Sequence, residues 1–97
     1  MNKIKKLKLF DNWLKKLKDI KARIAIARRI ERLKEGNPGD CKGVGENVFE
    51  LRITLGPGYR VYFKKDGENI IIIMMGGDKS TQSKDIKKAK EIARKLP

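Results

Sequence analysis

The stretch "ELRITLGPGYRVYF", residues 50–63, decides the fold of this chain. Apolar and polar residues alternate on both sides of Gly56-Pro57-Gly58, a pattern typical of a β-hairpin. A three-residue loop at Gly-Pro-Gly pairs apolar with apolar and polar with polar residues, whereas a two-residue loop at Pro57-Gly58 mixes the two faces. The three-residue loop predicts these polar pairs: Thr54 with Arg60, Arg52 with Tyr62, and Glu50 with Lys64. One face of the hairpin then enters the core, and the other gathers Arg52, Arg60 and Tyr62.

The segments around the hairpin predict two further strands. Asp66-Gly67 is a strong signal for a two-residue turn, which would set Phe63 opposite Ile70. The strand that follows, Asn69–Met75, is apolar on both faces and is therefore expected in the centre of the sheet, with Gly76-Gly77 ending it. Residues 3–8, "KIKKLK", predict a short strand or a lead into a helix. Residues 41–47, "CKGVGEN", are expected to form a loop.

Helical spacing of apolar residues predicts helices on either side of this sheet. The first contains Phe10, Trp13, Leu14 and Leu17, and the second runs from Ile20 to Leu33. Gly36 and the turn residues 37–40 end the second helix, so the two are expected to form a helical hairpin. A last helix is predicted after residues 80–83, where Ser80, Thr81 or Ser83 could cap it. Its expected buried stripe is Ile86, Ala89, Ala93 and Leu96.

Composition limits the class of protein. The 97 residues suit a single domain, 1–97, and 25 Lys and Arg against 12 Asp and Glu give a net charge of +13. Such an excess implies a polyanionic partner: nucleic acid, a ribonucleoprotein or an acidic protein segment. One cysteine and no histidine exclude an intrachain disulfide and the usual zinc sites, so no metal or cofactor is expected. The longest apolar run, residues 70–75, is too short to span a membrane, and we expect a soluble cytoplasmic protein without a membrane partner.

The polar face of the hairpin has the composition of a phosphate site. Diagonal neighbours in a sheet lie roughly 7–8 Å apart, so the guanidinium groups of Arg52 and Arg60 could converge on one phosphate. Tyr62 adds a ring for base stacking, and Lys79 lies where the last helix begins, at an end that favours anions. The alternative is a solvated sheet face on which Glu50 pairs with Lys64, a contact of little energetic consequence. The pattern alone leaves both interpretations open.

Four stretches in the same order resemble the RelE/ParE superfamily of bacterial toxin–antitoxin toxins, and most closely its HigB-like addiction-module killer proteins. They are "FDNWLKKLKD" (10–19), "GNPGD" (36–40), "VFELRITLGPGYRVYF" (48–63) and "GGDKSTQSKDIKKAK" (76–90). The resemblance implies an α+β fold, in which a small twisted, mainly antiparallel four-stranded sheet packs against an N-terminal helical hairpin, with a C-terminal helix. It also makes residues 3–8 a strand beside Asn69–Met75.

The resemblance also implies a function. Proteins resembling RelE and HigB cut mRNA in the ribosomal A site and so inhibit translation, whereas those resembling ParE poison DNA gyrase. In the nucleases, basic residues of the sheet bind RNA and stabilise the transition state. Arg52 and Arg60 match those positions, and Lys79 matches a basic residue that follows the last strand. Tyr62, Lys64, Thr81 and Gln82 are expected to contact RNA, and Glu50 and Asp85 are candidate acid–base groups.

The expected protein is thus the toxin of a type II toxin–antitoxin system, a metal-independent endoribonuclease whose partners are the ribosome with mRNA and a cognate antitoxin. Many nucleases of the superfamily carry a tyrosine or histidine near the C-terminus as acid or base. This chain has no histidine and no tyrosine after Tyr62. The alternatives are a ParE-like gyrase inhibitor without nuclease activity, and a protein that only binds an antitoxin.

Overall fold

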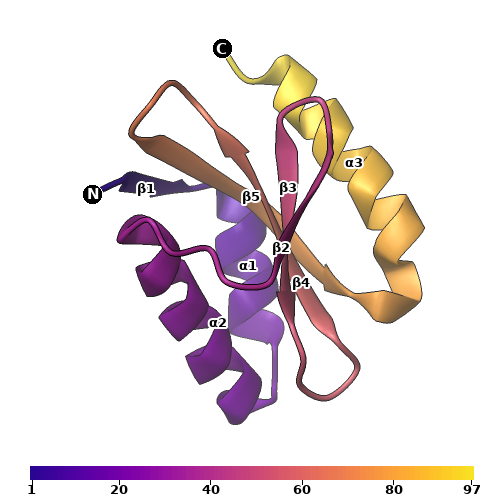
Figure 1. Cartoon of the computed structure of the whole chain (residues 1–97). Helices are drawn as coiled ribbons and strands as arrows, with labels where there is room; N and C mark the ends of the chain where they lie inside the picture. Colours follow the sequence, from indigo (N-terminus) through magenta and orange to yellow (C-terminus); the bar gives the residue numbers. More distant parts are fainter.

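The computed structural model describes residues 1–97 as a five-stranded sheet with helices on both faces (Figure 1). The elements in chain order are β1 (Lys3–Lys6), α1 (Lys8–Lys16), α2 (Ile20–Lys34), β2 (Cys41–Gly45), β3 (Val48–Ile53), β4 (Tyr59–Lys65), β5 (Ile70–Asp78), the 3₁₀ turn η1 (Lys79–Thr81) and α3 (Gln82–Lys95). The strand order is β1-β5-β4-β3-β2, and only the β1–β5 pair is parallel. The predicted α+β class is therefore confirmed, as are the strand at residues 3–8 and the central position of β5.

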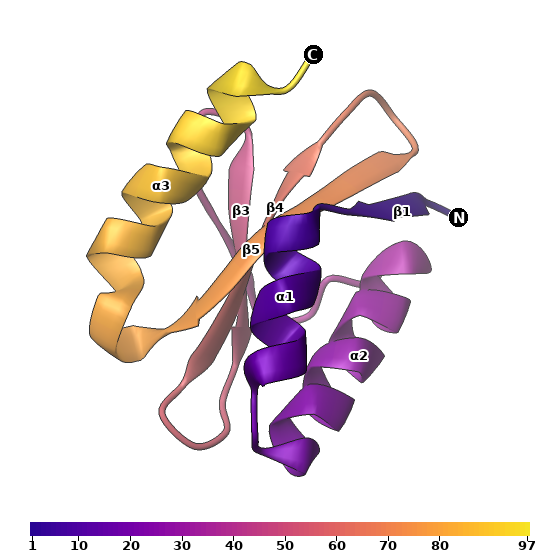
Figure 2. The same ribbon diagram turned by 180° about the vertical axis from the view of Figure 1, so that it is seen from behind.

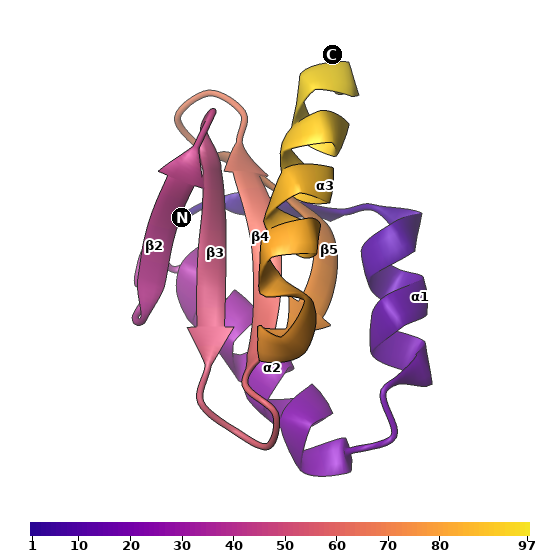
Figure 3. The ribbon, with the colours of Figure 1, turned by 90° about the vertical axis from the view of Figure 1, so that its right-hand side faces the viewer.

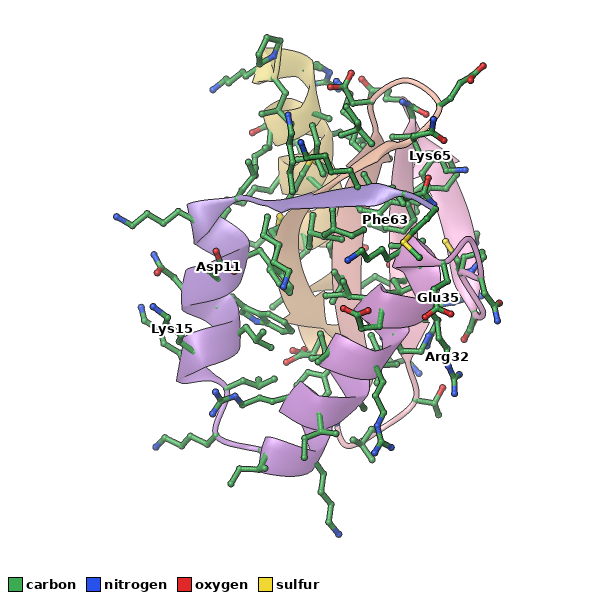
Figure 4. The ribbon with its side chains drawn as sticks, turned by 90° about the vertical axis from the view of Figure 1, so that its left-hand side faces the viewer. Asp11, Lys15, Arg32, Glu35, Phe63 and Lys65 are labelled. Atoms are coloured by element: carbon green, nitrogen blue, oxygen red, sulfur yellow. The ribbon has the colours of Figure 1, made fainter.

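The helices form a layer on each side of the sheet. Figure 2 shows α3 on one side of the sheet and α1 and α2 on the other; Figure 4 looks from the side that carries α1 and α2, and Figure 3 looks from the side that carries α3. The larger core lies under α1 and α2, where Phe10, Ile26 and Ile30 meet Leu51, Val61, Phe63 and Ile73 of the sheet. The smaller core lies under α3, where Ala89 and Ala93 meet Val48, Tyr62 and Met74. Because helices pack on both faces of the sheet, neither face is left as an open platform.

The prediction of a loop at residues 41–47 is wrong, since Cys41–Gly45 forms strand β2. It pairs with β3 antiparallel from Cys41 opposite Leu51 to Gly45 opposite Val48, with a bulge between Gly43 and Gly45. Its glycines and exposed lysine suppress the apolar alternation by which strands are recognised, and only Cys41 and Val44 are half-buried. The expected four-stranded sheet is therefore extended by an edge strand.

The predicted register of the main hairpin is also wrong, by two residues. Ile53 pairs with Tyr59, Arg52 with Arg60 and Glu50 with Tyr62, so the connection is Thr54–Gly58 rather than three residues. Leu55 does not pair but closes the turn, accepting a 3.0 Å hydrogen bond from the amide of Gly58, whose φ is +80°. A shift of two keeps every side chain on its predicted face. It brings Arg52 and Arg60 into direct opposition instead of a diagonal relation.

Strand β5 is longer and set differently from the prediction. It continues through Gly76 and Gly77 to Asp78, which pairs with Tyr59. The turn before it spans residues 66–69 and is closed by a 2.8 Å hydrogen bond from the Asp66 amide to the Ile70 carbonyl. As a result, Phe63 lies opposite Ile73 rather than Ile70. A bulge at Met74 then carries both Met74 and Met75 to the α3 side of the sheet.

Gly76 provides a test of how tightly α1 packs on β5. A Cβ added at Gly76 would overlap the indole ring of Trp13, which in turn meets Tyr59 edge-on. We expect Gly76→Ala to cost about 1–3 kcal/mol, the usual range for overpacking a filled site. The matched control is Gly43→Ala in β2, where the new Cβ would lie 3.6 Å from the Phe49 ring, an ordinary contact. Urea unfolding of both variants measures the difference, and equal midpoints would contradict this account of the Trp13 contact.

None of the three helices combines the length and the apolar composition needed to cross a membrane.

Candidate functional site

A cleft of about 380 Å³ opens beside the β3–β4 connection. Its lining residues are Asp40, Arg52, Ile53, Thr54, Gly56, Pro57, Gly58, Arg60 and Lys79. They come from the α2–β2 loop, from the facing ends of β3 and β4 and the connection between them, and from η1. The structure thus brings together all three cations that the sequence predicted as catalytic, with a single carboxylate, Asp40, beside them.

Arg52 lies on the exposed side of the cleft and is oriented by Asp40. Its Nε and Nη2 donate to Oδ1 of Asp40 at 3.1 and 2.9 Å, and the two side chains are 37% and 50% exposed. Arg29 of α2 fixes the backbone beneath this pair. Its Nη1 donates to the Arg52 carbonyl at 2.5 Å, and its Nη2 donates to the carbonyls of Pro38 and Asp40 at 2.9 and 3.0 Å. The 38–40 turn and β3 are therefore joined through one guanidinium.

Arg60 is held from the opposite side by a buried carboxylate. Its side chain is 12% exposed, its Nη1 donates to the Gly58 carbonyl at 2.7 Å, and its Nε lies 3.6 Å from Oε2 of Glu50. That Nε is buried and makes no hydrogen bond, so the contact with Glu50 is an ion pair alone. The guanidinium is therefore positioned from within the protein, and its Nη2 end remains available to the cleft.

Glu50 sits at the centre of what we call the Glu50 cluster: Glu50, Arg60, Tyr62 and Gln82. The carboxylate is fully buried and accepts from the Tyr62 hydroxyl at 3.0 Å and from Nε2 of Gln82 at 3.0 and 3.3 Å. Gln82 is the first residue of α3, so the cluster ties that helix to the sheet behind Arg60. A buried carboxylate is tolerable only with such partners.

Burial in this cluster changes what Tyr62 can do. The side chain is fully buried, so the ring has no face for an RNA base, which contradicts the expected stacking role. Burial, and then the nearby negative charge and hydrogen bond of Glu50, raise the pKa of the Tyr62 hydroxyl well above its usual range. The hydroxyl stays protonated at neutral pH and donates a hydrogen bond to Glu50. The expected pairs of Glu50 with Lys64 and of Arg52 with Tyr62 are wrong because the register of the hairpin is shifted by two residues, which sets Glu50 opposite Tyr62 and Arg52 opposite Arg60.

The raised pKa of Tyr62 predicts an alkaline loss of stability. The folded state holds this proton more tightly than the unfolded state, so the stabilisation is complete below pH 10 and is lost as the pH rises above it. We expect the gap in unfolding free energy between wild type and Tyr62→Phe to narrow by up to about 1.4 kcal/mol per pH unit above that point. Urea titrations at several pH values between neutrality and strong alkali measure it. A constant gap would contradict the buried phenol–carboxylate contact.

The remaining predicted residues fall outside the cleft or at its border. Lys79 is exposed and lines it, with its Cβ 3.5 Å from the position that a Cβ on Gly58 would occupy. Thr81 donates to Asp85 at 2.5 Å, and Asp85 lies against Gly77, so neither lines the cleft. Lys64 donates to the Ala93 carbonyl at 3.3 Å, near the far end of α3. The predicted hydroxyl caps of the last helix are wrong: Asp78 caps η1 through the Ser80 amide, and α3 has no side-chain cap.

The fold and the site define a small α+β protein whose sheet presents a cationic cleft. Residues 12–96 match the family described as phage-derived protein Gp49-like (DUF891), and the chain belongs to this family. It is also 53% identical over 93 residues to an uncharacterized protein of Haemophilus influenzae, covering 96% of this chain and 94% of the relative. These matches show the family.

Proposed function

We propose that this protein is the toxin of a type II toxin–antitoxin system, of the HigB-like type in the RelE/ParE superfamily, and that it cuts mRNA on the ribosome. The observation that carries the proposal is the cleft in which Arg52, Arg60 and Lys79 converge beside one carboxylate. Membership of the Gp49-like phage-derived family is in keeping with a toxin role. The net charge of +13 suits a ribonucleoprotein target and an acidic antitoxin segment that neutralises it.

The chemistry would be attack of an RNA 2′-hydroxyl on the adjacent phosphorus. Arg52 and Arg60 would bind the non-bridging oxygens and stabilise the charge of the pentavalent phosphorane, since both guanidinium groups keep free N–H donors. Lys79, which makes no ion pair, would give a proton to the leaving 5′-oxygen. The products are a 2′,3′-cyclic phosphate and a 5′-hydroxyl.

Dependence on the ribosome follows from what the cleft lacks. The chain has no histidine, and Tyr62 and Glu50 are buried behind Arg60 rather than exposed in the cleft. Because the cleft has no histidine, the side chain whose ordinary pKa lies near neutrality, much of the rate must come from correct orientation of the RNA, which the ribosome would supply.

A ParE-like gyrase inhibitor is the second candidate, and the burial of Tyr62 and Glu50 favours it. Burial of the phenol and of Glu50 removes two acid–base groups, and Asp40 already occupies two donors of Arg52. A protein that only binds needs a cationic surface and no proton transfer.

Expression in cells separates the two functions. The protein is induced, mRNA 5′ ends are mapped across the transcriptome, and DNA supercoiling by gyrase is assayed in parallel. Cuts phased with codons that vanish in Arg52→Ala support the nuclease. Intact mRNA together with cleavage of DNA by trapped gyrase would overturn it in favour of the inhibitor. Co-expression of the product of the neighbouring gene tests for the antitoxin by restored growth.

A further inference from the structure

Asp40 is the only acidic residue that lines the cleft. The two carboxylates that the sequence favoured are elsewhere: Glu50 is fully buried, and Asp85 is bonded to Thr81 beside Gly77. The sequence did not predict Asp40 as a site residue, because it ends "GNPGD", a stretch typical of a turn. Folding places this turn next to β3, where the side chain meets Arg52.

The Asp40 carboxylate is oriented and yet has a free oxygen. Oδ1 accepts both bonds from Arg52, at 3.1 and 2.9 Å, whereas Oδ2 takes part in no hydrogen bond. The side chain is 50% exposed. Its backbone is held independently, because Arg29 donates to the carbonyls of Pro38 and Asp40. An oriented carboxylate with one unpartnered oxygen is suited to accept a proton.

We propose that Asp40 is the general base of the reaction, an assignment that rests on the proposed nuclease function. Oδ2 takes the proton of the 2′-hydroxyl while the O2′–P bond forms. The P–O5′ bond breaks, and the 5′-oxygen takes a proton from the ammonium of Lys79. Asp40 then releases its proton to solvent and Lys79 regains one, so that both groups return to their starting states.

The Arg52 contact explains how an anionic base can lie next to an anionic phosphodiester. A bare carboxylate would repel the phosphate, but a guanidinium between them attracts both. Arginine has five N–H donors, of which Asp40 occupies one on Nε and one on Nη2. The Nη1 group and the second Nη2 hydrogen remain for a phosphate oxygen. Arg52 therefore holds the base and the electrophile on neighbouring sides of one planar group.

The test is single-turnover cleavage of ribosome-bound mRNA by Asp40→Asn. Asparagine keeps the shape and an acceptor for Arg52 but cannot take the proton, so we expect the rate to fall by about 10²–10⁴-fold with unchanged binding to the ribosome. The matched control is Asp66→Asn, in the β4–β5 connection outside the cleft, which should cut at the wild-type rate. Thermal unfolding of both variants checks that the fold is retained, as expected for an exposed ion pair.

A substrate with sulfur in place of the bridging 5′-oxygen separates the base from the acid. The thiolate leaves without a proton, so this substrate should restore the rate of Lys79→Ala but not that of Asp40→Asn. A near wild-type rate for Asp40→Asn, or its restoration by the sulfur, would overturn the assignment of Asp40 while leaving the nuclease function standing. Failure of the wild-type protein to cut ribosome-bound mRNA would overturn both.

Discussion

Replacement of Arg60 with alanine is expected to slow the cleavage of ribosome-bound mRNA by about 10²–10³-fold, the usual loss when one preorganised donor to a transition-state oxyanion is removed. The side chain is 12% exposed, and its guanidinium is set in place by Glu50 and the Gly58 carbonyl, so it meets the phosphate without first being ordered. Single-turnover rates on programmed ribosomes measure the effect. Arg60→Lys should recover little of it, because an ammonium lacks the planar fork of donors.

The control for Arg60 is Arg94→Ala. Arg94 pairs with Glu46 at 2.7 and 2.9 Å near the end of α3 and does not line the cleft. The Arg94→Ala substitution removes the same charge from the protein, and the cleavage rate of this variant should stay close to that of the wild type. Equal losses in the two variants would mean that total charge, and not the position of Arg60, governs activity. Because Arg60 also offsets the charge of buried Glu50, rates are compared below the unfolding temperature of each variant.

Replacement of Glu50 with alanine is expected to lower the free energy of unfolding by about 3–5 kcal/mol, as is typical when one partner of a buried ion pair is lost. The change leaves the Arg60 guanidinium nearly buried without its counter-charge, and it removes the acceptor of Tyr62 and Gln82. Total stability of a small domain is only about 5–15 kcal/mol, so the loss is large. Urea unfolding followed by circular dichroism measures it.

Two variants make the Glu50 result specific. Glu50→Gln keeps an acceptor of the same shape and should lose less than Glu50→Ala, whereas Arg94→Ala breaks an exposed pair and should leave the midpoint unchanged. If Glu50→Ala unfolded at the wild-type urea concentration, the Glu50 cluster could not be what ties α3 to the sheet.

The hairpin shows what alternation in a sequence can and cannot predict. Which residues share a face was predicted correctly, because the side-chain period of a strand is two. The register was not, since a shift by two residues satisfies the same alternation, and only the turn geometry of Leu55 and Gly58 decides between the possibilities. The edge strand Cys41–Gly45 was not predicted because two of its five residues are glycines, which have no side chain to mark an apolar or a polar face.

The candidate site was predictable in its cations and not in its surroundings. Arg52, Arg60 and Lys79 gather as expected. Alternation marks Glu50 and Tyr62 as polar-face residues, but it does not tell whether a helix covers that face. The small side chains of Ala89 and Ala93 let α3 lie close to the sheet over Tyr62, and Gln82 at the start of the same helix donates to the buried Glu50. Asp40 depends on a contact between a turn and a strand, which no local pattern records.

The most direct test of the central claim is a comparison of one mRNA sequence in two states, free in solution and bound in the A site of a ribosome, each mixed with the purified protein. Our account predicts cuts with 2′,3′-cyclic phosphate ends on the ribosome and little or no cleavage of the free RNA. Intact mRNA on the ribosome, or equal rates on both substrates, would contradict it.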